Sequence, residues 1–421
     1  MDRYNLAYII MVLLGAGTLF SYNAIMTAAD YFDDRYPKRN LTYLAPLCIA
    51  AFNPPLQALL IRYGNRVSAS FKISLSYSLL TILITLIPVF DSSLKADTTF
   101  YLTLILILAT GAATALICAT IFGFSTMYPA HYTQALMAGQ GWSGVIISLA
   151  RVISKASFAD TADGYRKSAI MFFALAAVVS FACIFGYFYL INTEFTKYYM
   201  RLRESANNAA PTSSRSDRSV GLLDDAITVD IHEASGAGAE SLIEKLPDPA
   251  ESWKGIFGVV YELRFPILNI LMVFIMTFLV FPGLLVSTKP YHLNISKGWF
   301  TVLNITIFNV FDLFGRSLPT YFMWFDGSNV HIPILARFLL YPIFLLGSLG
   351  KIRHYIVTIL FNIIFAASNG YLSSLVMMSA PAVVSEEKRA VGGGIMSLFL
   401  NFGILTGSIL ALFIKEVGHL D

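Results

Sequence analysis

Long runs of apolar residues, separated by short polar segments, are the dominant pattern along this chain. Each run has about twenty residues and little charge, which is the length an α-helix needs to cross the hydrocarbon core of a bilayer. Helices of a soluble protein would instead show an apolar stripe and a charged outer face. The pattern predicts about eleven transmembrane helices, at 6–29, 40–61, 71–90, 99–127, 135–156, 168–191, 263–286, 299–323, 331–349, 354–379 and 391–414.

One long polar stretch interrupts this pattern and divides the predicted helices into six and then five. Its centre is rich in small and polar residues such as Asn207 and Ser213, which bury too little apolar surface to fold. We therefore expect a six-helix bundle over 1–192, a flexible linker over 193–262 and a five-helix bundle over 263–421. This all-α, two-bundle layout resembles that of major facilitator transporters, whose halves each have six spans.

Composition supports an integral membrane protein and argues against several other classes. Hydrophobic residues make up 56% of the chain and charged residues only 13%, about half the charged share of an ordinary soluble domain. The net charge of +3 is small and spread over many loops, so we expect a lipid bilayer and no nucleic acid as partner. The three cysteines lie in apolar runs and the six histidines are scattered, so we expect no metal and no other cofactor.

The eighth predicted span contains the sharpest functional signal. Asp312 and Arg316 lie four residues apart, so they share one face of the helix and can pair, and Asn309 precedes them on that face. A charged side chain at the bilayer centre costs about 3 kcal/mol, so it normally faces a partner or a cavity. These groups suit a neutral solute with several hydroxyls and amide-like edges. The alternative is that the pair is purely structural and locks two bundles together.

Two other spans hold residues that fit either a binding site or a packing surface. Gln140 lies among glycines in the fifth span, where it can bind the edge of a planar base or bond across closely packed helices. Tyr22 in the first span can stack on a base or simply pack. We expect Arg151 and Arg337, near the ends of their spans, to extend their side chains to the membrane surface.

Several motifs together resemble those of the equilibrative nucleoside transporter family, along nearly the whole chain. They are Gly-x-Gly-Thr-Leu with Tyr-Asn and Met-Thr-Ala in span one, Ala-Gly-Gln-Gly in span five, Phe-Asn-Val-Phe-Asp-Leu-Phe-Gly-Arg-Ser in span eight and Ser-Asn-Gly-Tyr-Leu in span ten. The motif in span eight is the most specific. The start of the chain and the end of span one look most like the plant members.

The resemblance implies a major-facilitator-like fold with an internal amino terminus, a cytosolic linker and an external carboxyl terminus. It implies nucleosides, and often nucleobases, as substrates. By position, Asp312 and Arg316 would hold the ribose hydroxyls, and Gln140 would bind the base edge. Many members have tryptophan where this chain has Tyr22, so the base preference is not carried over. The remaining residues implied to contact the base or support the site are Leu19, Met26, Asn23 and Asn309.

We expect transport by alternating access, in which two bundles rock about a central site. Facilitated passage is the expected mode, and proton coupling through Asp312 or Asp30 is the alternative. Two competing hypotheses are a carrier for another small polar solute, such as a nucleobase or a sugar, and a membrane receptor or enzyme. We expect no enzymatic activity, because the sequence shows no nucleophile–base pair. We expect a monomer in the plasma membrane, with a vacuolar or other endomembrane as the alternative location.

Overall fold

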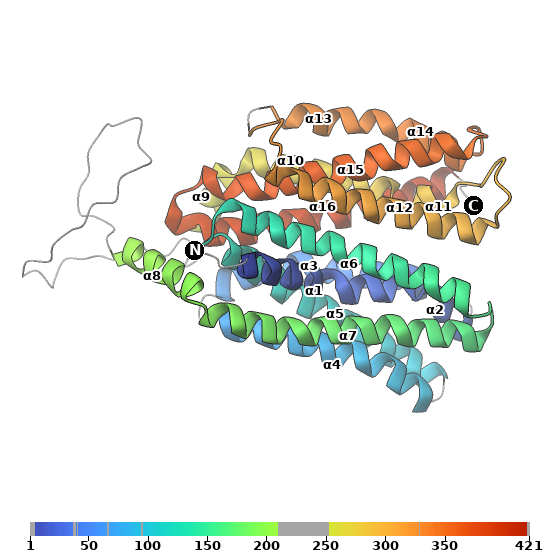
Figure 1. Ribbon diagram of the computed structural model, residues 1–421, viewed down its shortest axis with the longest axis horizontal. Coiled ribbons are helices and arrows are strands. Elements are labelled where there is room, and N and C mark those ends of the chain that lie inside the picture. Colours follow the sequence, from blue (N-terminus) through green and yellow to red (C-terminus); the bar gives the residue numbers. More distant parts are fainter. Residues whose placement is uncertain are drawn as a thin grey trace, which may run out of the picture.

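The structure is a computed structural model that describes residues 5–36, 39, 41–64, 67–93, 96–208, 252–327 and 329–418. All regular structure within these ranges is helical. The longer helices run roughly along one direction (Figure 1). The first bundle contains α1 (Leu6–Thr27), α2 (Ala29–Arg35), α3 (Leu41–Tyr63), α4 (Ala69–Ser93), α5 (Ala96–Ser125), α6 (Ala130–Ser157) and α7 (Ala162–Asn192).

The second bundle follows the linker and has five membrane-crossing segments. Its helices are α10 (Arg264–Val280), α11 (Gly283–Ser287), α12 (Lys297–Ser317), α13 (His331–Ala336), α14 (Tyr341–Ser348), α15 (Tyr355–Ser379) and α16 (Arg389–Gly418). The predicted linker is helical at both ends, where α8 (Glu194–Asn208) and α9 (Trp253–Glu262) lie, and its centre at 209–251 lies outside the described residues. The two bundles correspond to the six and five spans that the hydropathy pattern predicts.

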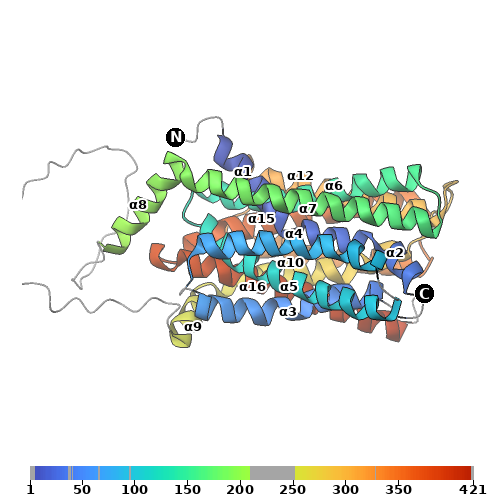
Figure 2. The same cartoon turned by 90° about the horizontal axis from the view of Figure 1, so that it is seen from below.

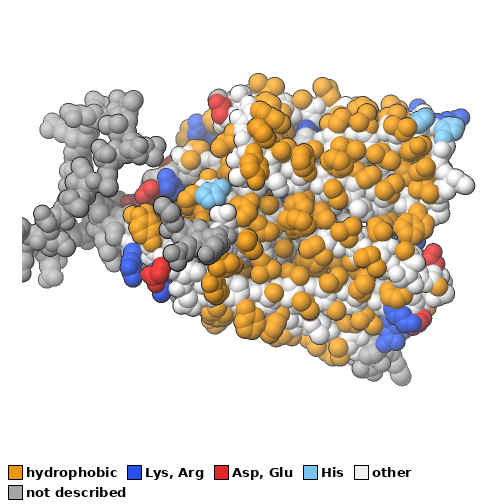
Figure 3. All heavy atoms as spheres, in the orientation of Figure 1, with side chains coloured by type: hydrophobic (Ala, Val, Ile, Leu, Met, Phe, Trp, Pro, Cys, Tyr) orange, Lys and Arg blue, Asp and Glu red, His pale blue; other side chains and the backbone are white. Residues whose placement is uncertain are grey.

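Ten helical segments of the described chain are long and apolar enough to cross a membrane. They match ten of the predicted spans, and the remaining span corresponds in position to α3, which has 23 residues. On the visible face, hydrophobic side chains cover the middle of the molecule and most charged side chains lie near its two ends (Figure 3). The chain is therefore an integral, multi-pass membrane protein, as predicted.

The start of α1 lies at the same end of the molecule as α8 and α9, and the end of α16 lies at the other (Figures 1 and 2). We call the end that holds α8 and α9 the linker-side end. This arrangement agrees with an amino terminus and a linker on the same side of the membrane.

The ninth predicted span is not one continuous helix, in contrast to the prediction. A 3₁₀ turn over Arg337–Leu340 separates α13 from α14. Pro342 follows at the start of α14, where its missing N–H is tolerated. The eighth span also ends earlier than predicted, because α12 stops at Ser317 and a 3₁₀ turn over Leu318–Thr320 contains Pro319.

Reciprocal glycine contacts bring pairs of helices together within each bundle. In the first bundle, a Cβ at Gly15 of α1 would overlap the carbonyl oxygen of Leu136 in α6, and one at Gly139 would overlap that of Val12. Only glycine at both positions permits this approach. Helices α1 and α6 therefore pack backbone against backbone and present their neighbouring side chains to a common region.

The second bundle repeats this device between α12 and α15. A Cβ at Gly315 would overlap the carbonyl oxygen of Ala367, and one at Gly370 would overlap the carbonyl oxygen of Asp312. The backbone of Asp312 is thus in direct contact with α15, which fixes the position of Asp312 relative to that helix.

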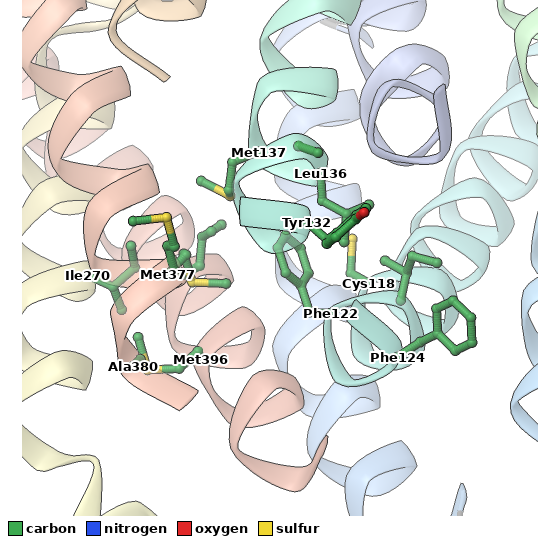
Figure 4. Close-up of a cluster of buried hydrophobic side chains, with 14 of the residues drawn as sticks. Cys118, Phe122, Phe124, Tyr132, Leu136, Met137, Ile270, Met377, Ala380 and Met396 are labelled. Atoms are coloured by element: carbon green, nitrogen blue, oxygen red, sulfur yellow. The ribbon is translucent and has the colours of Figure 1, made fainter. Parts of the chain in front are cut away.

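The bundles meet along α6 and α12, and again where α5 and α16 contact each other near the linker-side end. At the second contact, a Cβ at Gly123 would lie 2.7 Å from the carbonyl oxygen of Ala390, and one at Gly393 would lie 2.8 Å from that of Phe122. A buried hydrophobic cluster fills the space nearby (Figure 4). Its labelled members include Phe122, Tyr132, Leu136 and Met137 from the first bundle, and Ile270, Met377, Ala380 and Met396 from the second.

Candidate functional site

The centre of the candidate site is a buried ion pair on one face of α12. Nε of Arg316 donates to Oδ2 of Asp312 over 2.6 Å, and the two residues are only 6% and 5% exposed. Their spacing of one helical turn places both side chains on the same face, as the sequence predicts. An ion pair withdrawn from water this far depends on further hydrogen bonds to compensate for lost hydration.

The first bundle supplies some of these further bonds through α6. Nη1 of Arg316 donates to the carbonyl oxygen of Met137 over 3.2 Å and to Oε1 of Gln140 over 3.4 Å. A Cβ at Gly141 would lie 3.0 Å from Cδ of Arg316, so the absence of a side chain lets α12 approach α6 closely. The structure thus brings Gln140, Asp312 and Arg316 together at the boundary between the bundles.

Gln140 is buried and both ends of its amide are engaged. Its Nε2 donates to Oγ1 of Thr18 in α1 over 3.2 Å, while its Oε1 accepts from Arg316. The Thr18 hydroxyl in turn donates to the carbonyl oxygen of Gly15 over 2.7 Å. The 3.2 Å and 3.4 Å contacts of the amide are longer than most hydrogen bonds, so another polar group can replace them at modest cost.

The two predicted asparagines both bond to serines on α6. Asn23 of α1 donates to the hydroxyl of Ser143 over 2.8 Å, and Asn309 of α12 donates to the hydroxyl of Ser148 over 2.6 Å. A Cβ at Gly144 would lie 2.8 Å from Oδ1 of Asn309. Asn309 therefore contacts α6 instead of the ion pair itself, and the serines are site neighbours that the sequence reasoning did not identify.

The remaining predicted residues lie on α1 and are partly exposed. Tyr22 and Met26 pack against a buried cluster of the first bundle that includes Phe20. Leu19 is also partly exposed. Helical spacing places Leu19 and Met26 on the same face as Asn23, which is directed at α6.

The structure adds a residue behind Asp312 that the sequence did not assign to the site. Nδ2 of Asn369 in α15 donates to Oδ1 of Asp312 over 2.7 Å.

Arg337, expected to reach the membrane surface, is instead 3% exposed and bonds inside the second bundle, so that expectation is wrong. Arg151 pairs with Asp30 of α2. Hydropathy indicates how deep in the membrane a residue lies, but not which residues of other helices it contacts.

The chain also shows clear similarity to known proteins. The family model described as nucleoside transporter matches residues 104–416. Equilibrative nucleotide transporter 1 of Arabidopsis thaliana is 29% identical over 422 residues, which cover 98% of this chain and 86% of that protein. Equilibrative nucleoside transporter 1 of Homo sapiens is 28% identical over 462 residues, which cover 99% of this chain and 98% of that protein.

Solved structures of the major facilitator superfamily share the fold. The proton:xylose symporter XylE aligns with a TM-score of 0.67 at 12% identity, covering 100% of this chain and 91% of that chain. The Escherichia coli fucose:proton symporter FucP aligns with a TM-score of 0.60 at 11% identity, covering 98% and 92%. These likenesses confirm the predicted major-facilitator-like, two-bundle fold.

Proposed function

Since this chain belongs to the nucleoside transporter family, we propose that it carries nucleosides, and nucleobases as well, across a bilayer by alternating access. The fold supports this mode, because major facilitator proteins move solutes by rocking two bundles about a site between them. The protein is accordingly a transporter and not an enzyme.

The observation that carries the proposal is the buried pair of Asp312 and Arg316 at the boundary between the bundles. Each oxygen of the Asp312 carboxylate accepts one hydrogen bond from the protein, and each has a further lone pair to offer. Neighbouring hydroxyls of a ribose are neutral donors that match these acceptors. Arg316 also bonds to α6, so a ligand bound to the pair lies beside the contact between the bundles.

The base is assigned to the residues of α6 and α1. Gln140 offers both a donor and an acceptor to a base edge, once its long bonds to Thr18 and Arg316 are exchanged. The partly exposed side chains of Leu19, Tyr22 and Met26 are assigned to the base faces. Asn23 and Asn309 hold α1 and α12 against α6 and so support the site.

We assign facilitated passage as the mode of transport. Facilitated passage needs no proton carrier, and both oxygens of the Asp312 carboxylate, the candidate carrier, already accept hydrogen bonds from Arg316 and Asn369. Proton coupling is the alternative. We place the linker-side end in the cytosol and the protein, as a monomer, in the plasma membrane.

Uptake of labelled adenosine and uridine into liposomes that contain the purified protein tests the proposal. We expect saturable uptake of both, competition by unlabelled nucleosides, and no dependence on an imposed pH gradient. Protein-free liposomes and liposomes with Asp312→Ala serve as controls. Uptake of a sugar or only of free bases, with no nucleoside uptake, would overturn the proposed substrate class, and uptake that follows the pH gradient would overturn facilitated passage.

A further inference from the structure

Arg337 is a buried cation in the second bundle that the proposed binding site does not include. It lies in the 3₁₀ turn between α13 and α14, and Nη1 donates to the carbonyl oxygen of Val273 over 3.2 Å. Nε donates to the hydroxyl of Ser368 over 3.1 Å, and the guanidinium carbon lies 4.8 Å from the ring centre of Phe365. These contacts come from α10 and α15, so Arg337 lies between these two helices, and α15 also packs against α12 at Asp312.

The other terminal nitrogen of Arg337 connects it to the amide of Asn369. Nη2 donates to Oγ1 of Thr277 over 3.1 Å and lies 3.5 Å from Oδ1 of Asn369. The Thr277 hydroxyl donates to that same Oδ1 over 2.6 Å. Arg337 and Thr277 therefore face one end of the Asn369 amide together.

An arginine side chain can donate hydrogen bonds but cannot accept them. The end of the Asn369 amide that faces Arg337 must therefore be its oxygen, and its nitrogen must point the opposite way. That nitrogen donates to Oδ1 of Asp312 over 2.7 Å. The carboxylate of Asp312, which only accepts, selects the same orientation from the other end of the amide. Arg337 thus reinforces the one orientation of Asn369 that suits Asp312.

Asp312 consequently has a donor on each carboxylate oxygen. Arg316 donates to Oδ2 over 2.6 Å, and Asn369 donates to Oδ1 over 2.7 Å. Two donors from two helices fix both the position and the rotation of the carboxylate. The remaining lone pairs then point in set directions, which is the preorganisation that a binding site needs.

We propose that Arg337 is a positioning residue for substrate binding, which orients Asn369 and thereby holds the Asp312 carboxylate ready to accept the hydroxyls of a nucleoside. This inference rests on the proposed function. The charges agree with it, because Asp312, Arg316 and Arg337 are the buried charged residues of the described chain. The single carboxylate bonds directly to Arg316 and is linked to Arg337 through Asn369. A purely structural Arg337, which only joined α10 to α15, is what the experiment must distinguish from a positioning role.

The test compares adenosine with 3′-deoxyadenosine as competitors of labelled uridine uptake. The ratio of their inhibition constants measures how well the site recognises a ribose hydroxyl. In Arg337→Met we expect adenosine to lose about tenfold in affinity and 3′-deoxyadenosine much less, so the ratio moves toward one. Arg337→Lys retains the charge and should restore part of the ratio. Thr277→Val, a milder change, should shift the ratio in the same direction by a few-fold.

A matched control comes from the same pair of helices. Asn362 of α15 is fully buried and donates to the carbonyl oxygen of Asn304 in α12 over 2.8 Å, with no bond to Asp312. Asn362→Leu disturbs α12–α15 packing to a similar extent, and we expect it to keep the wild-type ratio. A structural role for Arg337 predicts that Asn362→Leu and Arg337→Met both lower the uptake rate and leave the ratio unchanged.

Asn369→Leu and Asp312→Asn complete the design. Asn369→Leu should reproduce the changed ratio, and adding Arg337→Met to it should change the ratio little further, because both act through one amide. If Asp312→Asn leaves the ratio unchanged, the proposed site itself is wrong. If Asp312→Asn changes the ratio while Arg337→Met, Arg337→Lys and Thr277→Val all leave it as in the wild type, the site stands and the role of Arg337 is overturned.

Discussion

Gln134 in α6 donates a hydrogen bond across the boundary between the bundles, over 2.8 Å, to the backbone carbonyl oxygen of Arg316 in α12. That carbonyl lies in the last turn of α12, where regular helical hydrogen bonding ends, and Pro319 three residues on has no N–H to donate. The oxygen of the Gln134 amide accepts from the hydroxyl of Tyr8 in α1 over 3.0 Å. Gln134 therefore joins α1 to α12 at the level of the ion pair.

Gln134→Leu should weaken the contact between the bundles at this level. The carbonyl oxygen of Arg316 loses a buried donor, which costs about 1–3 kcal/mol. We expect a lower unfolding temperature of the purified protein and slower nucleoside uptake. Asn192→Leu is the control, because Asn192 is exposed and bonds only to the carbonyl oxygen of Phe188 in its own helix. Equal losses in the two variants would contradict a special role for Gln134.

Breaking the ion pair of α12 should abolish transport. Asp312→Ala or Arg316→Ala leaves one buried charge without its partner, at a cost of about 3–5 kcal/mol. We expect uptake to fall by at least about a hundredfold in membranes that contain normal amounts of inserted protein. Asp30→Ala provides a contrast, since the pair of Asp30 with Arg151 is partly exposed and should tolerate the loss better. Near-normal uptake by inserted Asp312→Ala would refute the site assignment.

Gln140→Ala should change the ranking of adenosine, guanosine, uridine and cytidine, because each base presents a different set of donors and acceptors to an amide. Loss of such a hydrogen bond typically costs about 0.5–1.5 kcal/mol, so the affinities should change several-fold. The measurement is a competition series against one labelled nucleoside. Thr18→Val removes the hydroxyl to which Gln140 donates when no base is bound, and should leave the ranking unchanged. A uniform loss for all four nucleosides in Gln140→Ala would assign Gln140 to packing.

Gly370→Ala should force α15 away from α12. The added Cβ would overlap the carbonyl oxygen of Asp312, and backbone shifts of this kind cost about 1–3 kcal/mol or more. We expect a lower unfolding temperature and weaker nucleoside binding, because Asp312 itself must move. Gly258→Ala in α9 should be neutral, since nothing lies within 4 Å of the added Cβ. Wild-type binding by Gly370→Ala would show that the contact between α12 and α15 relaxes without moving Asp312.

Much of the fold follows from the sequence, because the bilayer imposes one length on every crossing segment. The apolar runs located the helices, and the four-residue spacing of Asp312 and Arg316 predicted their pairing. The interruption between α13 and α14 was not predicted, since the apolar composition continues through it.

The surroundings of the ion pair were harder to predict. Arg337 lies only a few residues into its span, which in a straight helix favours the membrane surface, but its turn faces α10 and α15. Asn369 belongs to the Ser-Asn-Gly-Tyr-Leu motif of span ten, but the sequence alone did not show that it faces Asp312 across a helix interface. Such contacts depend on how distant helices are rotated against each other, and hydropathy along one chain does not specify that rotation.

The glycines where α5 and α16 meet offer a means of trapping the protein. A Cβ added at Gly123 would lie 2.7 Å from the carbonyl oxygen of Ala390, and one added at Gly393 would lie 2.8 Å from that of Phe122. A tryptophan at either position cannot fit while α5 and α16 touch, so it favours conformations in which these two helix ends are separated. A protein held in this way would still bind its solute at one face of the membrane but would not complete the transport cycle. It would therefore be suitable for determining the structure of the state in which the linker-side end is open.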